Sequence, residues 1–592
     1  AEAYARQLAA EARRFTIVHS ELIAGINQIL RWITWALVPV AVLLLVTQLH
    51  ARDRAAQALT GTVAALVGMV PQGLVLLTSV AFGVAAVTLA RRRVLVQQLP
   101  AVEGLARVDV VCFDKTGTLT DGTIAFDTLI RLDGQTLAEA ALGALAADKH
   151  PNATLAAIGQ AFAPPDGWTR QAAVPFSSAR KWSAASFAGQ GTWVLGAPEM
   201  VLPASQQHYL AQAAALADSG RRVLLLARAA GSLDGERLPP DLRPAAFITF
   251  TERLRSDAAE TIAYFTAQGV AMKVISGDSP RTVSAIAARA GIPQSGDPAD
   301  ARDLPDDPAA LGRILEKRSV FGRVTPHQKQ AMVTALQARG HTVAMTGDGV
   351  NDVLALKLAD LGIAVGSGAP ATRAVAELVL LDGRFATLPG VVAEGRRVTA
   401  NIERVANLFL TKTVWATLLA IAAGITLLPF PFLPRHLTVI DTLAIGIPSY
   451  FLALAPNTRR YRRGFTRRVL RFAIPAGAIV AAAAFAAYWL TRAAGLPEVQ
   501  QRTAATLVTL TLSLTVLTML AMPLTWRRIL LVVAAVTGFA LLFPVPALRR
   551  FYALDLPRGE LGLTLLTAAL GTAALACFWA LSRWSPRASR ER

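Results

Sequence analysis

The sequence predicts a multi-spanning α-helical membrane domain joined to a soluble α/β domain. Three observations lead to this fold class. Long uncharged segments have the length of membrane-spanning helices, and a central block between about residues 91 and 400 has an ordinary soluble composition. Within that block, short apolar runs alternate with helical patterns, as they do in parallel, doubly wound sheets.

About eight segments are apolar over the roughly 20 residues that a spanning helix needs. Two precede the soluble block and six follow it: about 32–49, 58–89, 408–433, 437–456, 470–490, 504–524, 528–547 and 560–582. Core helices of a large soluble protein could imitate one or two such segments, but not eight in this arrangement. The sequence therefore predicts a multi-pass membrane protein.

The basic residues behind the net charge of +19 lie beside these segments. They cluster at 91–93, 457–468, 526–528 and in the C-terminal tail, whereas "ALRR" (547–550) falls on the other side. Because basic loops remain on the cytoplasmic side, we expect the soluble block in the cytoplasm and the protein in the plasma membrane. Its surroundings are then membrane lipids, and no nucleic-acid partner is expected.

Three aspartates follow apolar runs in the soluble block: Asp114, Asp278 and Asp348. The site of a doubly wound sheet lies beyond the carboxyl ends of its strands, so these side chains are expected at one edge. Three carboxylates there would repel one another unless a cation lay among them, and Mg²⁺ favours one or two carboxylates plus phosphate oxygens. Solvated turn aspartates are the alternative, which is reasonable for any one of them but not for all three.

Four motifs around these aspartates resemble the signature set of the P-type ATPases: "DKTGTLT" (114–120), "SGD" (276–278), "TPHQK" (325–329) and "MTGDGVND" (345–352). The similarity covers nearly the whole chain, which resembles type II-like cation pumps of an actinobacterial branch linked to calcium. The resemblance implies a cytoplasmic, haloacid-dehalogenase-like phosphorylation domain with an inserted α+β nucleotide-binding domain.

The resemblance also implies the domain boundaries. They are 1–30 for a linker after an actuator domain that the chain lacks, 31–90 for the family's third and fourth transmembrane helices, 91–126 and 251–400 for the phosphorylation domain, 127–250 for the nucleotide-binding domain, 401–585 for six further transmembrane helices and 586–592 for a cytoplasmic tail. Because the family's actuator positions the hydrolytic water, such a chain is expected to phosphorylate itself without completing the cycle.

In the family, the aspartate of DKTGT takes the γ-phosphoryl group of ATP, which makes Asp114 the expected nucleophile. Lys329 would neutralise transition-state charge, and Asp348 would hold Mg²⁺. The resemblance also places Lys115, Thr116, Ser276, Gly277 and Asp278 among the catalytic residues, and Asp114, Thr116, Asn351 and Asp352 beside the metal. Ser276 stands where the family usually has threonine, and a hydroxyl survives this exchange.

The inserted segment carries the expected nucleotide site. "FSSARKWS" (176–183) resembles the family's adenosine-binding motif, in which Phe176 offers an aromatic face and Lys181 a charge for the phosphates. By resemblance, Gly196 of "LGAPE" (195–199) and Arg222 also contact the nucleotide. An ordinary core position is the alternative for Phe176.

"VPQGL" (70–74) breaks the second apolar segment and resembles the PEGL break in the fourth span of type II cation pumps. Proline removes one helix hydrogen bond, and freed carbonyls in a membrane survive only where they are buried or line a cavity. A cation site is therefore expected near Val70 and Gln72, although the family's glutamate is replaced by Gln72. A simple proline kink is the alternative.

Two charged residues, Lys412 and Asp441, lie inside apolar segments after the soluble block. Intramembrane charges are expensive and usually functional, and by resemblance Asp441 aligns with an oxygen ligand of calcium pumps. Lys412 has three readings: it pairs with Asp441, it acts as a fixed counter-ion, or its side chain extends to an interface.

The function implied is cation transport driven by ATP, with Ca²⁺ as the cation by resemblance, Mg²⁺ as cofactor and no obligate protein partner. A lipid flippase of the same superfamily is an alternative, because Gln72 is neutral and Lys412 is basic. A membrane-tethered phosphatase and a nucleotide-binding regulator without transport are further alternatives.

Overall fold

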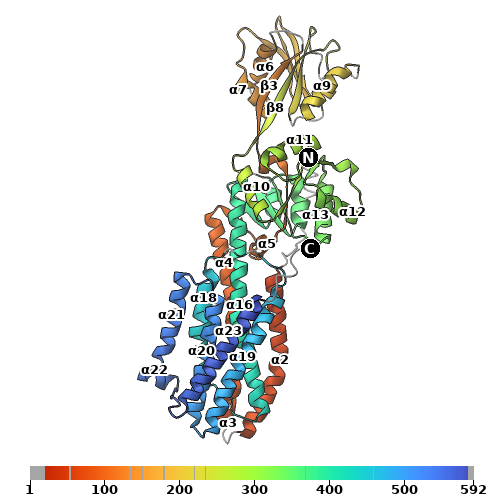
Figure 1. The fold of residues 1–592 in the computed structure, drawn as a ribbon. Coiled ribbons are helices and arrows are strands. Elements are labelled where there is room, and N and C mark those ends of the chain that lie inside the picture. The colour runs from red at the N-terminus through yellow and green to blue at the C-terminus, as the bar shows by residue number, and fades with distance from the viewer. Residues whose placement is uncertain are drawn as a thin grey trace. The chain divides into compact units, whose positions relative to one another are not determined.

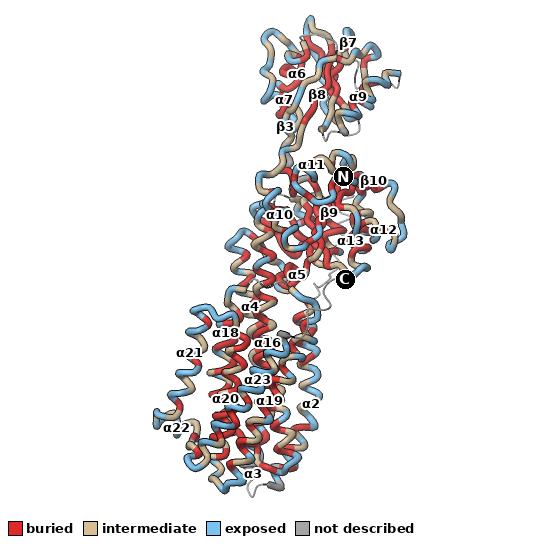
Figure 2. Tube along the Cα trace, in the orientation of Figure 1, coloured by how far each residue is buried: buried red, intermediate tan, exposed pale blue. Residues whose placement is uncertain are grey.

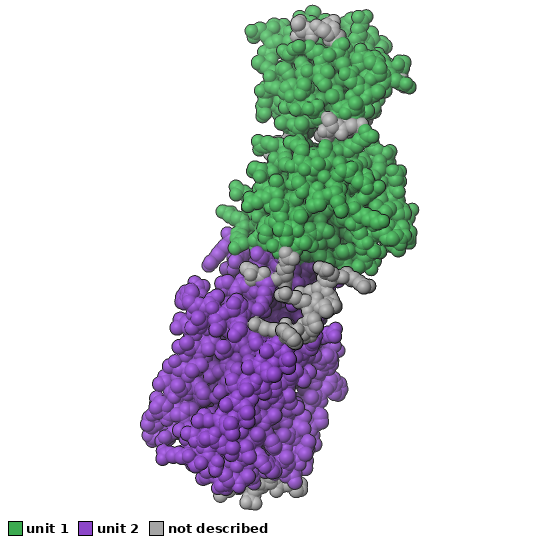
Figure 3. Space-filling view, viewed as in Figure 1, with its two compact units in different colours: residues 1–17, 92–97, 108–390 green, residues 18–91, 98–107, 391–592 purple. Residues whose placement is uncertain are grey.

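The computed structural model describes residues 20–51, 55–132, 137–148, 151–177, 180–203, 205–218, 221–233, 235, 237–366, 368–457, 459 and 461–584. The chain divides into two compact units (Figure 3). We call residues 1–17, 92–97 and 108–390 the sheet unit, and residues 18–91, 98–107 and 391–592 the helical unit. Most of the expected linker and the whole expected tail lie outside the described residues.

The sheet unit is built on an eight-stranded sheet. Its strands, in spatial order, are β1 (Val94–Val96), β14 (Leu378–Leu380), β13 (Leu361–Val365), β12 (Val343–Gly347), β2 (Val110–Phe113), β9 (Ala271–Ile275), β11 (Val320–Gly322) and β10 (Ala299–Asp300). Neighbouring strands are parallel except for β1 and β14. The predicted parallel sheet is confirmed.

Helices alternate with these strands along the chain: α10 (Ala258–Ala267), α11 (Pro280–Ala290), α12 (Pro308–Lys317), α13 (Pro326–Ala338), α14 (Val353–Leu358) and α15 (Pro370–Val375). Several begin with a capping side chain and proline in the first turn, which together fix the start of a helix. α12, α13 and α14 pack on the sheet through a core that includes Phe321, Met332 and Val343. Figure 2 shows this buried layer running through the strands.

A second, antiparallel sheet is inserted after β2 and forms the expected α+β domain (Figure 1). Its strands are β3 (Thr120–Arg131), β8 (Arg243–Leu254), β7 (Arg222–Ala229), β6 (Gly191–Gly196), β5 (Trp182–Phe187) and β4 (Arg170–Val174). α6 (Ala138–Ala146) and α7 (Ala153–Ala161) share one core with the sheet, while α8 (Pro198–Val201) and α9 (Gln207–Asp218) share another. Alternate residues of β6 face the two cores, so both faces of the sheet are covered.

The helical unit contains α2 (Glu21–Ala51), α3 (Ala55–Met69), α4 (Gln72–Arg91), α5 (Ala101–Arg107), α16 (Leu388–Ile425), α17 (Pro434–Ile440), a π-helical turn (Asp441–Gly446), α18 (Ile447–Leu454), α19 (Phe465–Ala493), α20 (Glu498–Ala521), α21 (Trp526–Leu541), α22 (Pro546–Phe551) and α23 (Leu561–Trp584). α19, α20 and α23 pack against one another. α3 and α4 are separated at Val70 and Pro71, where the sequence predicts a break.

Seven stretches of the described residues are long and apolar enough to cross a membrane: 21–47, 59–91, 385–425, 434–454, 465–493, 498–521 and 561–582. The eighth expected span, 528–547, does not form one helix of this length. α21 has 16 residues, and at about 1.5 Å per residue it is roughly 24 Å long, shorter than a hydrocarbon core of about 30 Å. Pro546 then begins the separate helix α22.

A buried carboxyl group holds one side of the eight-stranded sheet together. Glu377, which is 3% exposed, precedes β14, and its Oε2 accepts a hydrogen bond of 2.6 Å from the Gly362 N–H in β13. Its own carbonyl accepts a hydrogen bond of 2.9 Å from the Gln97 N–H beside β1. Burial raises the pKa of Glu377 from 4.5 to about 7, although the hydrogen bond from Gly362 opposes this shift.

Glu377→Gln keeps the acceptor oxygen but removes the charge. Since the folded protein binds the Glu377 proton more tightly than the unfolded chain, the contribution of Glu377 to stability falls as the pH rises from about 4.5 to 7. We expect the variant and the wild type to unfold at similar temperatures near pH 4.5, and the variant to be more stable by about 3 kcal/mol at pH 8. Thermal unfolding of the full chain at both pH values measures this difference.

Glu316→Gln is the matched control, because contact with Arg339 lowers the pKa of Glu316 and the trend with pH should reverse. A difference between Glu377→Gln and wild type that does not change with pH would contradict the prediction.

Candidate functional site

The eight-stranded sheet brings the predicted site residues to one edge. Asp114 follows β2, Asp348 follows β12 and Asp278 follows β9 by a short turn. β2 lies between the other two strands, and Phe113 pairs with Thr346 on one side and with Val274 on the other. The three carboxylates are therefore positioned by neighbouring parallel strands, as the sequence predicts.

Lys329 connects two of the predicted carboxylates. It lies in the first turn of α13, which Thr325 and Gln328 cap reciprocally. Its Nζ donates hydrogen bonds of 2.7 Å to Asp114 Oδ2 and 2.7 Å to Asp352 Oδ1. Burial alone would lower the pKa of Lys329, but the carboxylates of Asp352 and Asp114 raise it above its usual value. The ammonium group therefore stays charged beside Asp114.

Asp352 is almost fully buried, at 1% exposure. Burial raises its pKa, while the contact with Lys329 opposes that shift. The structure thus places Asp352 against the lysine, and the neighbouring Asn351 is exposed. An uncompensated charge at this depth is strongly unfavourable. The buried charges of Lys329 and Asp352 therefore stabilise each other.

Asp348 lies beside Asp114 and against Gly117. Burial raises the pKa of Asp348, and the charge of Asp114 adds to the effect. A Cβ atom at Gly117 would contact the Asp348 carboxylate, and Gly117 has φ +74°, which L-residues rarely adopt. The side chain of Thr116 lies outside the described part of the chain.

The pair Asp114 and Asp348 fits Mg²⁺. Among the residues that the structure describes, no group of three or more His, Cys, Asp or Glu side chains could hold a metal. Two neighbouring carboxylates leave the remaining coordination positions to phosphate oxygens and water, which is how Mg²⁺ is usually bound. Their mutual repulsion also favours a cation between them.

Lys115 joins the two sheets. Its side chain is 1% exposed and contacts the carboxylates of Glu252 in β8 and Asp278 after β9. Glu252 also accepts a hydrogen bond of 2.9 Å from Thr120 Oγ1 at the start of β3. Lys115 and Asp278, two of the predicted catalytic residues, therefore contact each other. Asp278 follows β9, which lies on the opposite side of β2 from β12.

The loop after β9 is held by backbone hydrogen bonds. The Ser276 N–H donates to the Phe321 carbonyl at 3.0 Å, and the Val324 N–H donates to the Ser276 carbonyl at 3.0 Å. Ser276 is buried, whereas Gly277 is exposed. The predicted phosphoryl-binding backbone is thus accessible at Gly277 and fixed at Ser276.

The predicted nucleotide-binding residues gather at one end of the antiparallel sheet. Gly196 ends β6 and pairs with Trp182, which follows Lys181 and begins β5. Arg222 begins β7 at the same end, because β6 and β7 are antiparallel. Phe176 precedes the turn closed by the hydrogen bond of 2.7 Å from the Lys181 N–H to the Ser177 carbonyl, and its ring is 45% exposed. An ordinary core position is therefore excluded for Phe176.

A cavity of about 430 Å³ lies where this end of the antiparallel sheet approaches α11. Its lining includes Arg222, Glu252 and Asp278, so a residue of the predicted nucleotide set shares a cavity with one of the catalytic set. The cavity is also lined by Arg221, whose Nε lies 2.8 Å from Asp127 Oδ2.

Sequence reasoning missed Glu252 and Arg221. Glu252 carries a usable signal, because it ends an apolar run as the three aspartates do. Arg221 directly precedes Arg222, and nothing in the sequence separates their roles.

Comparison with known proteins identifies the family to which the chain belongs. A family model described as haloacid dehalogenase-like hydrolase matches residues 108–360. The calcium-transporting ATPase CtpE of Mycolicibacterium smegmatis is 48% identical over 570 residues, which cover 94% of this chain and 72% of the relative. The protein of that name from Mycobacterium tuberculosis is 47% identical over 601 residues (98% and 75%), and the probable cation-transporting ATPase exp7 of Streptococcus pneumoniae is 35% identical over 562 residues (92% and 71%). The chain belongs to the P-type cation-transporting ATPases.

The helical unit of this P-type ATPase contains an ion pair where the sequence predicts a transport site. Lys412 Nζ in α16 donates a hydrogen bond of 2.6 Å to Asp441 Oδ2, at the start of the π-helical turn. Lys412 is 3% exposed. Of the three readings for Lys412, the structure shows the pair with Asp441.

The helix break packs against the face of α16 that carries Lys412. A Cβ atom at Gly68 would lie 3.2 Å from Ala416 Cβ, and one at Gly73 would lie 2.6 Å from Phe409 Cζ. Gly68 and Gly73 stand on either side of the break, and residues 409, 412 and 416 share one helix face. The break and the ion pair are therefore neighbours, although the Gln72 side chain is exposed.

Gly117→Ala tests how tightly Asp348 is positioned in this P-type ATPase. The variant would strain a left-handed backbone and displace the Asp348 carboxylate, so we expect it to lower the free energy of unfolding by about 2–3 kcal/mol. Gly269→Ala is the control: φ is +69° there, but a Cβ atom would meet nothing within 4 Å. We expect about 1 kcal/mol for the control, and equal losses in thermal unfolding would show that Asp348 is not held by this contact.

Proposed function

We propose that the chain couples ATP hydrolysis to cation transport through an aspartyl phosphate at Asp114, and that the cation is Ca²⁺. The observation that carries the proposal is the Lys329 ammonium, which lies 2.7 Å from both Asp114 and Asp352 at the carboxyl ends of the central strands. The names of the two calcium-transporting relatives support Ca²⁺ as the cation.

In the proposed reaction, a carboxylate oxygen of Asp114 attacks the γ-phosphorus of ATP. A bond forms between this oxygen and phosphorus, and the bond between phosphorus and the bridging oxygen of ADP breaks. Because Lys329 contacts Asp114 Oδ2, Oδ1 would be the attacking oxygen. The ammonium group also offsets negative charge as it develops on the phosphoryl oxygens.

Asp114 and Asp348 would hold Mg²⁺, which when bound neutralises phosphate charge and orients the transferred group. Asp352 acts through Lys329, because it fixes the position of the ammonium group. The backbone of Gly277 and the hydroxyl of Ser276 would receive the phosphoryl oxygens. Asn351 would support the site from the exposed side of the same turn.

The antiparallel sheet would bind the rest of ATP. Phe176 presents an exposed ring on which adenine can stack, while Lys181 and Arg222 supply positive charge at the same end of the sheet. Gly196 adds close packing, since a Cβ atom there would lie 2.9 Å from Val201 Cγ2. The cavity that Arg222 and Asp278 line would receive the phosphates.

The transported cation would bind at the ion pair beside the helix break. Asp441 Oδ1 is buried and makes no hydrogen bond within the described residues. Buried polar atoms usually have partners, so this oxygen is a candidate cation ligand. A bound cation would compete with the Lys412 ammonium for Asp441.

Phosphorylation tests the proposed nucleophile. With labelled ATP and Mg²⁺, we expect wild type to form an acid-stable phosphoprotein and Asp114→Asn to form none. Lys329→Met should slow labelling by about 10²–10³-fold, because charge stabilisation of the transition state is lost. Lys317→Met changes an exposed lysine of α12 and should label at the wild-type rate. Labelling that persists in Asp114→Asn would refute the assignment.

Cation dependence tests the proposed transport site. Across a panel of Ca²⁺, Mn²⁺, Na⁺ and K⁺, we expect Ca²⁺ to govern phosphorylation. Asp441→Asn should raise the half-maximal Ca²⁺ concentration by roughly 10-fold or more, and Lys412→Met should lower it by about 10-fold because competition is removed.

Arg468→Gln is the matched control, since it removes the charge from another ion pair of the helical unit, with Glu403 at 2.8 Å. It should leave the Ca²⁺ dependence unchanged. Phosphorylation that ignores all cations would contradict the cation site and favour a lipid flippase.

A further inference from the structure

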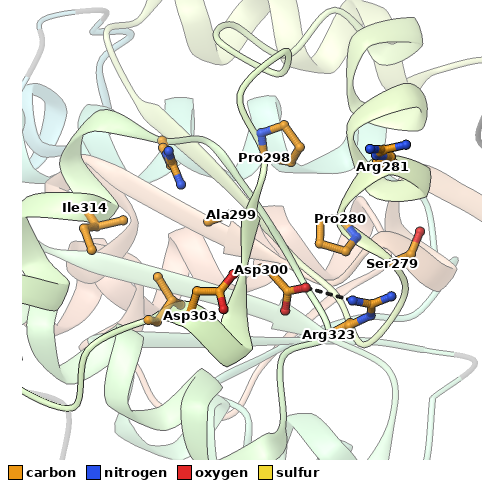
Figure 4. Close-up of a pocket in the computed structure, with 11 residues that line it drawn as sticks. Ser279, Pro280, Arg281, Pro298, Ala299, Asp300, Asp303, Ile314 and Arg323 are labelled. Atoms are coloured by element: carbon orange, nitrogen blue, oxygen red, sulfur yellow. Dashed lines mark hydrogen bonds and ion pairs between the residues drawn. The ribbon is translucent and has the colours of Figure 1, made fainter. Parts of the chain in front are cut away.

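A second cavity, of about 560 Å³, lies at the outer edge of the eight-stranded sheet (Figure 4). It is lined by the loop from β9 into α11, by residues at and after β10, by the end of α12 and by Arg323 after β11. The loop after β9, the residues after β10 and Arg323 follow the carboxyl ends of parallel strands, where doubly wound sheets bind ligands. The end of α12 leads into the amino end of β11 and closes the cavity from that side. The proposed phosphorylation reaction uses none of the side chains that point into this cavity.

Three arginines from three different elements line the cavity. Arg281 lies in the first turn of α11, Arg318 follows α12, and Arg323 follows β11. They face two lining carboxylates, Asp300 and Asp303, so the cavity has an excess of positive charge. Guanidinium groups donate paired hydrogen bonds that match phosphate oxygens in geometry and charge.

Two of these arginines are held in place by acidic partners. Arg323 Nη1 lies 2.8 Å from Asp300 Oδ2, the contact drawn as a dashed line in Figure 4, and Arg318 Nε lies 3.0 Å from Asp297 Oδ2. Hydrogen bonds from Arg302 and Arg323 hold the pKa of Asp300 well below its usual range, so this anchor is ionised at neutral pH. Each guanidinium has further donors that a ligand can use.

The backbone of Arg323 is also constrained. Its φ is +57°, an uncommon value for a residue other than glycine, and its N–H donates a hydrogen bond of 2.7 Å to the Asp278 carbonyl. Such conformations persist where the surrounding structure enforces them, and they are frequent at binding sites. The arginine is therefore fixed at both its backbone and its side chain.

Apolar residues complete the lining. Pro298, Leu304 and Ile314 provide carbon surface beside the arginines, and Figure 4 shows Pro298 and Ile314 around the same space as Asp300. A ligand that fits this lining has one strongly anionic group and a compact apolar body. A tetrahedral anion suits the site better than a planar carboxylate, because its oxygens do not lie in one plane and the guanidinium groups of the lining come from three elements.

We propose that this cavity binds a small organic phosphate, with its phosphate on Arg281, Arg318 and Arg323 and its apolar part on Pro298, Leu304 and Ile314.

Protection of the arginines from chemical modification tests this site directly. The probe is phenylphosphonate, which carries a non-hydrolysable phosphate-like group on an apolar ring, and the protein is the full chain with Asp114→Asn so that phosphorylation plays no part. After phenylglyoxal treatment, peptide mass spectrometry reports the modification of each arginine. We expect phenylphosphonate to reduce modification of Arg281, Arg318 and Arg323 several-fold.

Arg289 of α11 and Arg313 of α12 are exposed residues outside the cavity on the same helices, and their modification should not change. Arg281→Gln should weaken protection of Arg318 and Arg323 by about 10-fold, while Arg289→Gln should not. Benzoate, a planar carboxylate of similar size, and inorganic phosphate, which lacks the ring, should both protect less well.

Equal protection of Arg289 and Arg313, or no protection of the cavity arginines, would overturn the site. Protection by benzoate as strong as that by phenylphosphonate would overturn the assignment to phosphate. Protection in the Asp114→Asn chain does not depend on transport or phosphorylation, so this test can fail or succeed separately from the proposed function.

Discussion

The sheet unit depends on one ammonium group held between two carboxylates. Lys329 is buried at 2.7 Å from both Asp114 and Asp352, and burial on this scale is tolerated only because charges of opposite sign are in direct contact. The capping box at Thr325 fixes the first turn of α13 and thus the start of the Lys329 side chain. The order of β12, β2 and β9 fixes the carboxylates. Sheet topology and helix capping together create the electrostatics of the site.

A second lysine has a different task, although it follows Asp114 directly. Lys115 contacts Glu252 and Asp278, and it thereby connects the strand pair that leads into the antiparallel sheet with the loop after β9. Its pKa is raised because these two carboxylates outweigh the effect of burial. Consecutive residues of one motif therefore have different partners: Asp114 contacts Lys329, whereas Lys115 contacts Glu252 and Asp278. The cavity of about 430 Å³ is lined by Glu252 of the antiparallel sheet and by Asp278 after β9, which are the two carboxylates that Lys115 contacts.

Much of this organisation could be predicted from the sequence, because it depends on local patterns. Apolar runs that end in aspartate identified β2, β9 and β12, and uncharged segments of spanning length identified seven of the long helices. The contacts of Lys115 with Glu252 could not be predicted, since they join residues far apart in the chain through strand register. The apolar segment 528–547 does not form one continuous helix, because Pro546 starts a new helix within it. The exposure of Gln72 could not be predicted either, because it depends on the orientation of α4 after the helix break, which composition does not specify.

The antiparallel sheet enters and leaves the rest of the sheet unit through β3 and β8, which are hydrogen-bonded neighbours. Thr120 at the start of β3 pairs with Leu254 at the end of β8, so the two ends of the insertion meet. Its two cores lie on the faces of its own sheet and draw on residues between these ends. A segment cut at these two positions would keep all the strand pairings of the six-stranded sheet. The insertion is thus suited to recombinant expression as a free-standing soluble domain, or to transfer into another host protein by a single graft at adjacent ends.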